Sequence, residues 1–160
     1  MNKHTVSILV NDQPGVLQRV AGLFGRRGFN IESITVGCSE EAGLSRMIVV
    51  TSGDERTLDQ ITKQLGKLID VIAVRQLSGL PMVSRELALI RVHVQPLKRP
   101  EILGVVETFR GSIIDIAADT MVVEIVGEAE KIQAMVELMR PYGIQELTRT
   151  GVTAMARGAR

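Results

Sequence analysis

One order of secondary-structure elements occurs twice in this chain, and it limits the possible folds more than any other feature. Residues 5–77 alternate short apolar runs with two amphipathic stretches, in the order strand, helix, strand, strand, helix, strand, and residues 87–150 repeat that order. A glycine and three apolar residues at matching spacing relate the two copies: Gly53, Leu58, Ile61 and Leu65 in the first, and Gly127, Ile132, Met135 and Met139 in the second. The sequence therefore predicts an α+β chain of two tandem ferredoxin-like βαββαβ domains, each with an antiparallel sheet and both helices on one face.

The boundary between the copies is marked by Gly79-Leu80-Pro81. The chain has 160 residues, and each copy takes roughly 75–80 of them, which is within the lower range of domain sizes. We assign residues 1–78 to the first domain and residues 84–155 to the second. The residues from Ala154 onward are small and basic, and we predict a frayed tail over 156–160.

Composition excludes several kinds of partner. The net charge of +1 gives no long-range field toward nucleic acid or an acidic membrane, and aromatic residues, at 2%, are too scarce for stacking on bases. No apolar run reaches the roughly 18 residues that a membrane-spanning helix needs, and no secretory signal opens the chain. Cys38 is the one cysteine in the sequence, so no internal disulfide can form. We expect a cytoplasmic protein with no nucleic-acid or membrane partner.

No set of residues predicts catalysis or metal binding. His4 and His93 lie far apart, outside any metal-ligand spacing, and the acidic pairs Glu40-Glu41 and Asp54-Glu55 fit a solvated turn and a helix start. A catalytic site needs a convergent group of side chains. We therefore predict no catalytic residue, no metal site and no cofactor on this chain, and an unrecognised small enzyme is the least favoured alternative.

The turn after the first strand is the best candidate for ligand binding. A helix starts there, with Asp12 or Gln13 as its capping residue. Backbone N–H groups at a helix start lack intrahelical partners and attract anions such as a carboxylate, and Gly15 leaves the backbone open to a ligand. Asn11 and, at the start of the second strand, Asn30 add amide groups. The alternative is that both asparagines are ordinary cap and turn residues.

This turn and several later segments resemble a known family. The segments are Asn11–Leu17, Arg19–Phe24, Arg27–Ser33, Leu44–Met47, Phe109–Gly111 with Ile113–Asp115, and Arg149–Val152. The first turn and helix resemble an ACT domain. The stretch Asn30-Ile31-Glu32-Ser33 and the motifs of the second half narrow the resemblance to the small regulatory subunits of acetolactate synthase (acetohydroxyacid synthase). The similarity spans nearly the whole chain.

The resemblance implies a subunit that catalyses nothing itself. It implies a partner, the catalytic large subunit, which carries thiamine diphosphate, FAD and Mg²⁺ and condenses two pyruvates, or pyruvate with 2-oxobutyrate. The small subunit would activate this partner and make it sensitive to feedback by valine, bound at the interface of a homodimer of ACT domains. On this chain the implied effector-binding residues are Asn11, Asp12, Gly15, Val16 and Leu17 of one protomer, and Asn30 and Ile31 of the other.

Other functions share parts of this pattern. The main alternative is a stand-alone ACT-type amino-acid sensor with a different partner. An RNA-recognition module has the same βαββαβ order, but it needs aromatic residues on its central strands, and residues 5–10, 47–51 and 87–94 contain none. The second domain has no Asn-x-x-Pro-Gly turn, so we do not expect it to bind the same ligand, and we assign it to dimerisation or subunit contact.

Overall fold

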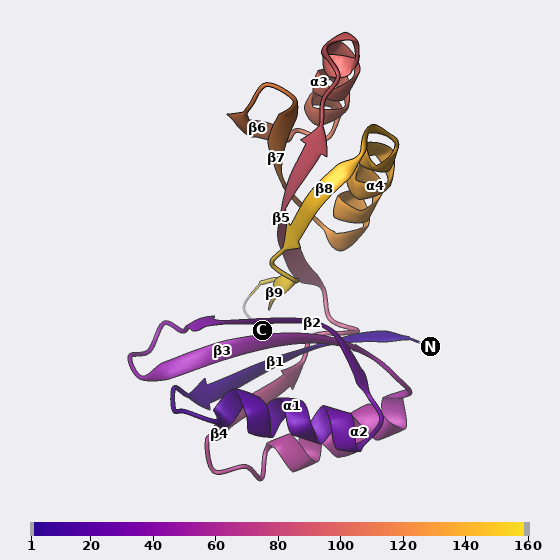
Figure 1. The fold of residues 1–160 in the computed structure, drawn as a ribbon. Helices are drawn as coiled ribbons and strands as arrows, with labels where there is room; N and C mark the ends of the chain where they lie inside the picture. The colour runs from indigo at the N-terminus through magenta and orange to yellow at the C-terminus, as the bar shows by residue number, and fades with distance from the viewer. Residues whose placement is uncertain (1, 159–160) are drawn as a thin grey trace. The chain divides into compact units, whose positions relative to one another are not determined.

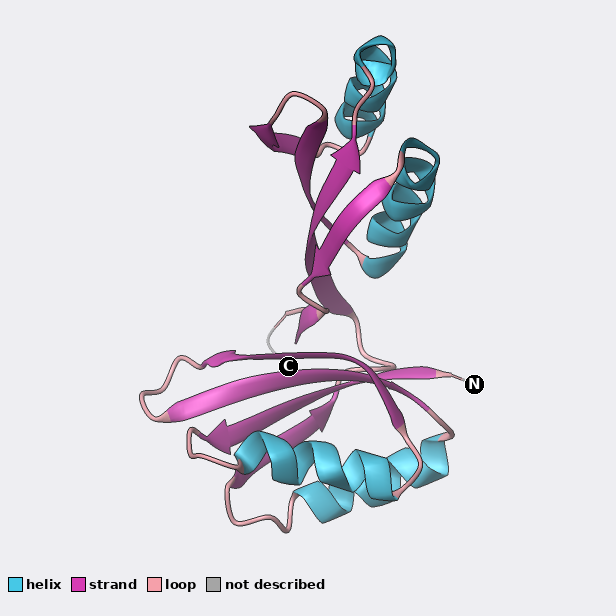
Figure 2. Cartoon of the chain, in the orientation of Figure 1, coloured by secondary structure: helices cyan, strands magenta, loops and turns pink. Residues whose placement is uncertain are grey.

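The computed structural model describes residues 2–158 and divides the chain into two compact units. The first unit contains the residues up to Val83 together with the C-terminal segment that starts at Val152. The second unit is Ser84–Gly151. Figure 1 labels their helices and strands, and Figure 2 colours them by type.

The first unit is a four-stranded sheet with two helices on one face (Figure 1). Its strands lie in the order β2-β3-β1-β4, and all three pairings are antiparallel. The elements are β1 (Lys3–Asn11), α1 (Val16–Arg26), β2 (Asn30–Cys38), β3 (Leu44–Ser52), α2 (Glu55–Leu65) and β4 (Val71–Gln76).

Alternating residues of the strands and one stripe of each helix form the core of the first unit. The core side of β1 carries Val6, Ile8 and Val10, because successive residues of a strand point to opposite faces. Residues three and four apart on α1 and α2 lie on one side of each helix, and those that pack on the sheet are Val16, Val20, Leu23, Phe24, Leu58, Ile61 and Leu65. The helices are therefore held mainly by burial of aliphatic side chains, to which Phe24 adds one aromatic ring.

The second unit repeats this plan. Its strand order is β6-β7-β5-β8 with antiparallel pairing, and α3 and α4 cover one face (Figure 2). The elements are β5 (Met82–His93), η1 (Pro96–Lys98), α3 (Arg99–Thr108), β6 (Ser112–Ile116), β7 (Thr120–Gly127), α4 (Ala129–Met139), η2 (Arg140–Tyr142) and β8 (Ile144–Arg149). Its core is again aliphatic, with Ile90 on β5, Val123 on β7, Val106 on α3 and Met135 on α4 all buried. The predicted fold, two ferredoxin-like βαββαβ domains, is confirmed.

The C-terminal segment differs from the prediction. We assigned 152–155 to the second domain and 156–160 to a frayed tail, but Thr153–Ala156 forms a further strand, β9, within the first unit. The Val152 N–H donates to Ser33 Oγ at 2.7 Å, Thr35 Oγ1 donates to the Val152 carbonyl at 3.3 Å, and the Arg157 N–H donates to the Pro81 carbonyl at 2.9 Å. These partners are distant in sequence, so local composition could not predict them. Residues 159–160 of the predicted tail lie outside the described residues.

The strand β5 crosses the junction between the units. The division between Val83 and Ser84 lies within the range 78–84 where the sequence placed the boundary, and β5 already begins at Met82. β9 pairs with β5, and the Arg157 side chain donates through Nε to the Met82 carbonyl at 3.3 Å. The start of β5 is therefore held in extended form by its pairing with β9 and by the hydrogen bond from Arg157.

Candidate functional site

The turn between β1 and α1 is fixed by backbone hydrogen bonds on both sides. The Asn11 N–H donates to the Asp70 carbonyl at 2.8 Å, and the Asp12 N–H donates to the Gly43 carbonyl at 2.9 Å. The Gln13 N–H closes the turn on the Asn11 carbonyl at 2.9 Å. The turn is thus anchored to two other loops at the same end of the sheet, while the side chains of Asp12 and Gln13 are exposed to solvent.

Gly15, rather than Asp12 or Gln13, occupies the capping position of α1. Its φ of 85° lies in the left-handed region, which favours glycine, and no side chain caps the helix. A Cβ atom at this position would lie 3.2 Å from the Arg19 guanidinium. The prediction that Asp12 or Gln13 caps the helix is therefore wrong. The helix start keeps N–H groups that no capping side chain satisfies, which suits an anionic ligand.

Two of the predicted residues at the helix start face in different directions. Val16 is only 3% exposed and packs in the core, so its side chain is not available to a ligand. Leu17 is 46% exposed and offers an apolar surface next to the turn. Of these two residues, only Leu17 can offer an apolar contact to a ligand.

Asn30 and Ile31 lie at the opposite end of the sheet from this turn. Asn11 pairs with Leu44 of β3, whereas Asn30 pairs with Ser52 near its other end. Leu44 and Ser52 are eight residues apart, which corresponds to roughly 26 Å of strand. Asn30 is exposed, and Ile31 is partly buried against the core. One chain therefore does not bring the seven predicted effector-binding residues together.

The end of the sheet around Asn30 is held by charged and hydroxyl groups. Thr51 Oγ1 donates to the Asn30 carbonyl at 2.7 Å. Ser52 Oγ donates to a Glu32 carboxylate oxygen at 2.5 Å, and the Lys3 ammonium lies 3.2 Å from the same carboxylate. The Ser52 hydrogen bond, together with Lys3, lowers the pKa of Glu32 below its usual range. Glu32 is therefore ionised at neutral pH beside Asn30 and Ile31.

Sequence reasoning missed an ion pair at the turn. The Arg19 guanidinium donates to the Asp70 carboxylate, and it also lies beside Gly15. Arg19 is four residues after Gly15, and this spacing on a helix places the two residues on one side. The position of Arg19 beside Gly15 could therefore have been predicted. Asp70 comes from the distant loop before β4 and could not have been found from spacing. The pair places a partly exposed cation next to the uncapped helix start.

The described residues provide no metal centre. Between residues 2 and 158, no group of three or more His, Cys, Asp or Glu side chains is placed to hold a metal ion. His4, one of the two histidines in the sequence, is buried, and its Nε2 lies 2.8 Å from the Gly53 carbonyl oxygen. No helix in the described part of the chain is long and apolar enough to cross a membrane.

Two family descriptions match the chain, one for each half. Residues 6–73 match the family described as an AHAS small subunit-like ACT domain, and residues 85–158 match the small subunit of acetolactate synthase. The chain belongs to the acetolactate synthase small-subunit family. The predicted resemblance, with an ACT domain in the first half, is confirmed.

Relatives of the acetolactate synthase small-subunit family match over nearly their whole length. A probable acetolactate synthase small subunit of Methanothermobacter thermautotrophicus is 56% identical over 98% of this chain and 94% of its own length. The acetolactate synthase small subunit of Bacillus subtilis is 49% identical over 98% of this chain and 91% of its own. The crystal structure of the acetolactate synthase small subunit from Thermotoga maritima is 44% identical, covers all of both chains and superposes with a TM-score of 0.93.

Proposed function

We propose that this chain activates the catalytic large subunit of acetolactate synthase and makes it sensitive to feedback inhibition by valine. In this proposal the large subunit carries thiamine diphosphate, FAD and Mg²⁺ and performs the chemistry. Membership of the small-subunit family supports the partner. The observation that supports an effector is the uncapped helix start at Gly15, next to Asn11 and the exposed Leu17.

The turn offers the groups that an amino acid needs. The carboxylate of valine accepts hydrogen bonds from the first N–H groups of α1, and the Arg19 guanidinium, which is paired with Asp70, lies beside them. The Asn11 side chain offers an acceptor to the ammonium group. Leu17 contacts the isopropyl group. A metabolite sensor works at a dissociation constant of about 0.1 mM, or −5.5 kcal/mol, which a few such contacts provide.

A second copy of the chain completes the site in this proposal. β2 is an edge strand of the sheet, and its last residue, Cys38, pairs with Ser45, next to the Leu44 that pairs with Asn11. Antiparallel pairing of β2 with β2 of a partner would bring the partner's Asn30 toward Cys38. That is the end of the sheet that carries the Asn11 turn, whereas Asn30 of the same chain is roughly 26 Å away along the strand.

Inhibition requires that valine bind one state of the complex more tightly than another. A coupling free energy of about 1–3 kcal/mol between effector site and catalytic subunit is typical, and it is reciprocal. Valine clamped between two ACT domains would change the geometry of the dimer, and this change would pass to the large subunit. Binding of the large subunit should therefore change the valine affinity by the same factor.

Mixed dimers test whether two copies form the site. We expect Asn11→Ala and Asn30→Ala each to raise the valine concentration for half-inhibition at least about tenfold, because each loses an amide partner, while both still activate the large subunit. Co-expression of the two variants yields mixed dimers in which one of the two sites is intact. Recovery of valine inhibition in the mixture supports a shared site, and no recovery contradicts it. Gln18→Ala, an exposed amide on α1, is the control.

Substitution of Gly15 separates charge from backbone strain. Gly15→Ala and Gly15→Asp both place a Cβ atom at a φ of 85°, but only aspartate places a carboxylate where that of valine is proposed to bind. We expect Gly15→Asp to abolish valine inhibition and Gly15→Ala to weaken it less. The measurement is the activity of the large subunit, purified with each variant, against valine concentration. Inhibition of the Gly15→Asp variant at the valine concentrations that inhibit the wild type would contradict the proposed site. Failure of the wild-type chain to bind the large subunit would instead favour a stand-alone sensor.

A further inference from the structure

The turn that leads into β4 carries an aliphatic side chain that is almost fully exposed. Ile69 lies between α2 and β4 and is 94% exposed. The Val71 N–H donates to the Leu68 carbonyl at 3.1 Å, which makes Ile69 and Asp70 the two central residues of a β-turn. Such positions favour proline, glycine and short polar residues. The turn itself therefore does not account for an isoleucine at this position.

Ile69 is not an isolated apolar residue. Ile72, the second residue of β4, is 52% exposed. Figure 1 shows this turn at the same end of the first unit as the start of α1, where Leu17 is 46% exposed. We name Ile69 and Ile72 the β4 patch. Grouped apolar side chains on a surface indicate an interaction site, whereas single ones do not.

The corresponding turn of the second unit carries a side chain that has partners. The carbonyls of Asp70 and Gly143 accept, at 2.8 Å, a backbone hydrogen bond from the last residue of β1 and of β5 respectively. The residues before them, Ile69 and Tyr142, therefore correspond. Tyr142 packs against the core of its unit and donates through its hydroxyl to Glu101 at 2.9 Å. The shared fold thus accommodates a partnered side chain here, and the exposure of Ile69 is specific to the first unit.

The turn that carries Ile69 is bonded directly to the proposed valine site. The Asp70 carbonyl accepts from the Asn11 N–H at 2.8 Å. The Asp70 carboxylate accepts from the Arg19 guanidinium, which also lies beside Gly15. A carboxylate bound at Gly15 would share the N–H donors of Arg19 with Asp70. Effector binding would therefore act on the residue next to Ile69.

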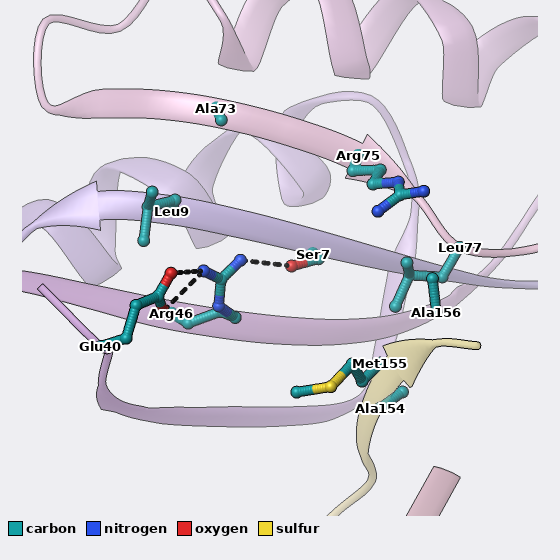
Figure 3. A pocket seen from close by; sticks show the side chains of 10 residues that line it. All are labelled: Ser7, Leu9, Glu40, Arg46, Ala73, Arg75, Leu77, Ala154, Met155 and Ala156. Atoms are coloured by element: carbon teal, nitrogen blue, oxygen red, sulfur yellow. Dashed lines mark hydrogen bonds and ion pairs between the residues drawn. The ribbon is translucent and has the colours of Figure 1, made fainter. Parts of the chain in front are cut away.

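The outer face of the same sheet, by contrast, is partly covered by the chain itself. A cavity of about 480 Å³ on the face opposite α1 and α2 has residues of β9 in its wall, and Figure 3 shows its Arg46 held by Glu40 and Ser7. Arg46 Nη2 donates to both Glu40 carboxylate oxygens, at 3.1 and 3.2 Å. No segment within residues 2–158 covers Ile69 in a comparable way.

We propose that the β4 patch contacts the catalytic large subunit and transmits valine binding to it. This inference rests on the proposed function, from which both the partner and the effector are taken. β4 is the edge of the sheet opposite to β2, so pairing of two copies through β2 leaves the patch free for a different chain. The matching surface of the large subunit is an apolar recess, because exposed aliphatic side chains bind where water is excluded.

Binding of the large subunit to the full chain tests the contact. Ile69→Ser should weaken this binding at least about tenfold, because it removes the apolar anchor. Ile69→Leu, which keeps an aliphatic side chain of the same size, should bind within about twofold of the wild type. Leu97→Ser is the control, because Leu97 is as exposed, at 92%, but lies in the second unit. Biolayer interferometry with purified large subunit measures all three variants.

Valine titrations test the transmission. The ratio of the valine dissociation constants with and without the large subunit measures the coupling between the two sites. Asp70→Asn keeps the size of the side chain and removes the charge that Arg19 holds, so we expect this ratio to move at least about threefold toward one. Glu40→Gln is the control, because it removes the carboxylate of another arginine pair in the same unit. Isothermal titration calorimetry gives both constants for each variant.

Three results would overturn the contact. These are binding of Ile69→Ser as tight as that of the wild type, an equal loss in Leu97→Ser, and dissociation of the wild-type oligomer by Ile69→Ser in sedimentation velocity without the large subunit. The third result would assign the β4 patch to a contact between copies of this chain. An unchanged ratio in Asp70→Asn would overturn the transmission.

Failure of the proposed function gives a different result. In that case the wild-type chain itself does not bind the large subunit, and the inference falls with it. If the wild type binds and Ile69→Ser binds equally, only the β4 patch is wrong. Because Ile69 is exposed, its substitution should leave the fold intact, and circular dichroism melting of each variant checks this.

Discussion

The two units share one backbone plan and differ at the turn after their first strand. In the first unit the Asn11 N–H donates to the Asp70 carbonyl at 2.8 Å, and in the second the His93 N–H donates to the Gly143 carbonyl, also at 2.8 Å. Neither α1 nor α3 has a capping side chain, but the first unit has a left-handed Gly15 before its helix, whereas the second has the 3₁₀ turn Pro96–Lys98. The common frame supports the fold, and the turn is where the units can differ in function.

The glycine before the second helix packs against a different side chain in each unit. Gly53 lies against the Phe29 ring, and an added Cβ would be 2.1 Å from its nearest carbon. Gly127 lies against Lys131, and an added Cβ would be 2.5 Å from Cδ. Phe29 is buried and rigid, while the lysine chain can move away. The same residue is therefore required in one unit and replaceable in the other.

The largest expected effect is that of Gly53→Ala. The clash with Phe29 has no room to relax, so we expect the free energy of unfolding to fall by about 3 kcal/mol. Gly127→Ala should cost less than about 1 kcal/mol, since only Lys131 must shift. Scanning calorimetry of both variants measures the difference. Equal losses would show that the two glycines have the same role, and restoration of Gly53→Ala by Phe29→Leu would support the clash.

The next effect concerns how the first strand of the second unit is held. Glu86 is buried, and its carboxylate accepts from Arg149 Nε at 2.5 Å and from Nη2 at 3.2 Å. Glu86→Gln leaves the partly buried Arg149 without its counter-charge, and we expect a loss of about 2 kcal/mol. The matched control is Glu146→Gln, whose exposed carboxylate lies 3.9 Å from Arg91 and should contribute less than about 0.5 kcal/mol. Thermal unfolding followed by circular dichroism gives both values, and similar losses would contradict this ranking.

The smallest expected effect concerns the N-terminal cap of the second helix in each unit, α2 and α4. Asp54 caps α2 by accepting from the Thr57 N–H at 2.8 Å, and this bond lowers the pKa of Asp54. A lowered folded pKa means that the charge stabilises fully above the ordinary value of about 3.9 and loses this effect as pH falls through the folded pKa. Asp54→Asn keeps a capping group without the charge. Its melting temperature should therefore be about 1–2 °C below wild type at pH 7 and equal to it near pH 2.

The corresponding residue of the second unit sharpens this prediction. Glu128 occupies the capping position of α4 but makes no capping bond through its side chain. Glu128→Asp shortens the side chain to the length that caps α2, so it should raise the melting temperature slightly at pH 7. Melting curves at pH 7 and pH 2 for both variants check the pair. A difference between Asp54→Asn and wild type that is the same at both pH values would contradict the charge argument.

Local patterns predicted the elements, while contacts distant in sequence determined what was missed. The 3.6-residue spacing of Leu58, Ile61 and Leu65 and the alternation along β1 predicted their burial, because burial follows from periodicity. The strand β9 was missed because the contacts around it are distant in sequence: Val152, the residue before it, bonds Ser33 and Thr35, which are 119 and 117 residues away. A pattern over neighbouring residues does not indicate a partner so distant in sequence.

The candidate site, too, could be predicted only in those parts that local sequence determines. The sequence identified the turn by its Asn11 and Gly15, but it could not tell which turn residue takes the left-handed conformation, and it placed the helix cap at the wrong residue. It also could not show that Val16 points into the core, because Val16 and Leu17 are both apolar neighbours at a helix start. The separation of Asn30 from this turn follows only from strand order and register.

The return of the last residues to the first unit has a consequence for synthesis. Domains usually fold in order as the chain leaves the ribosome, the N-terminal one first. Here the second unit is an insertion within the first, since the residues up to Val83 and those from Val152 belong together. Nascent chains that already contain all of Ser84–Gly151 still lack β9, the strand that pairs with β5. The first unit is thus completed only after the second has been synthesised.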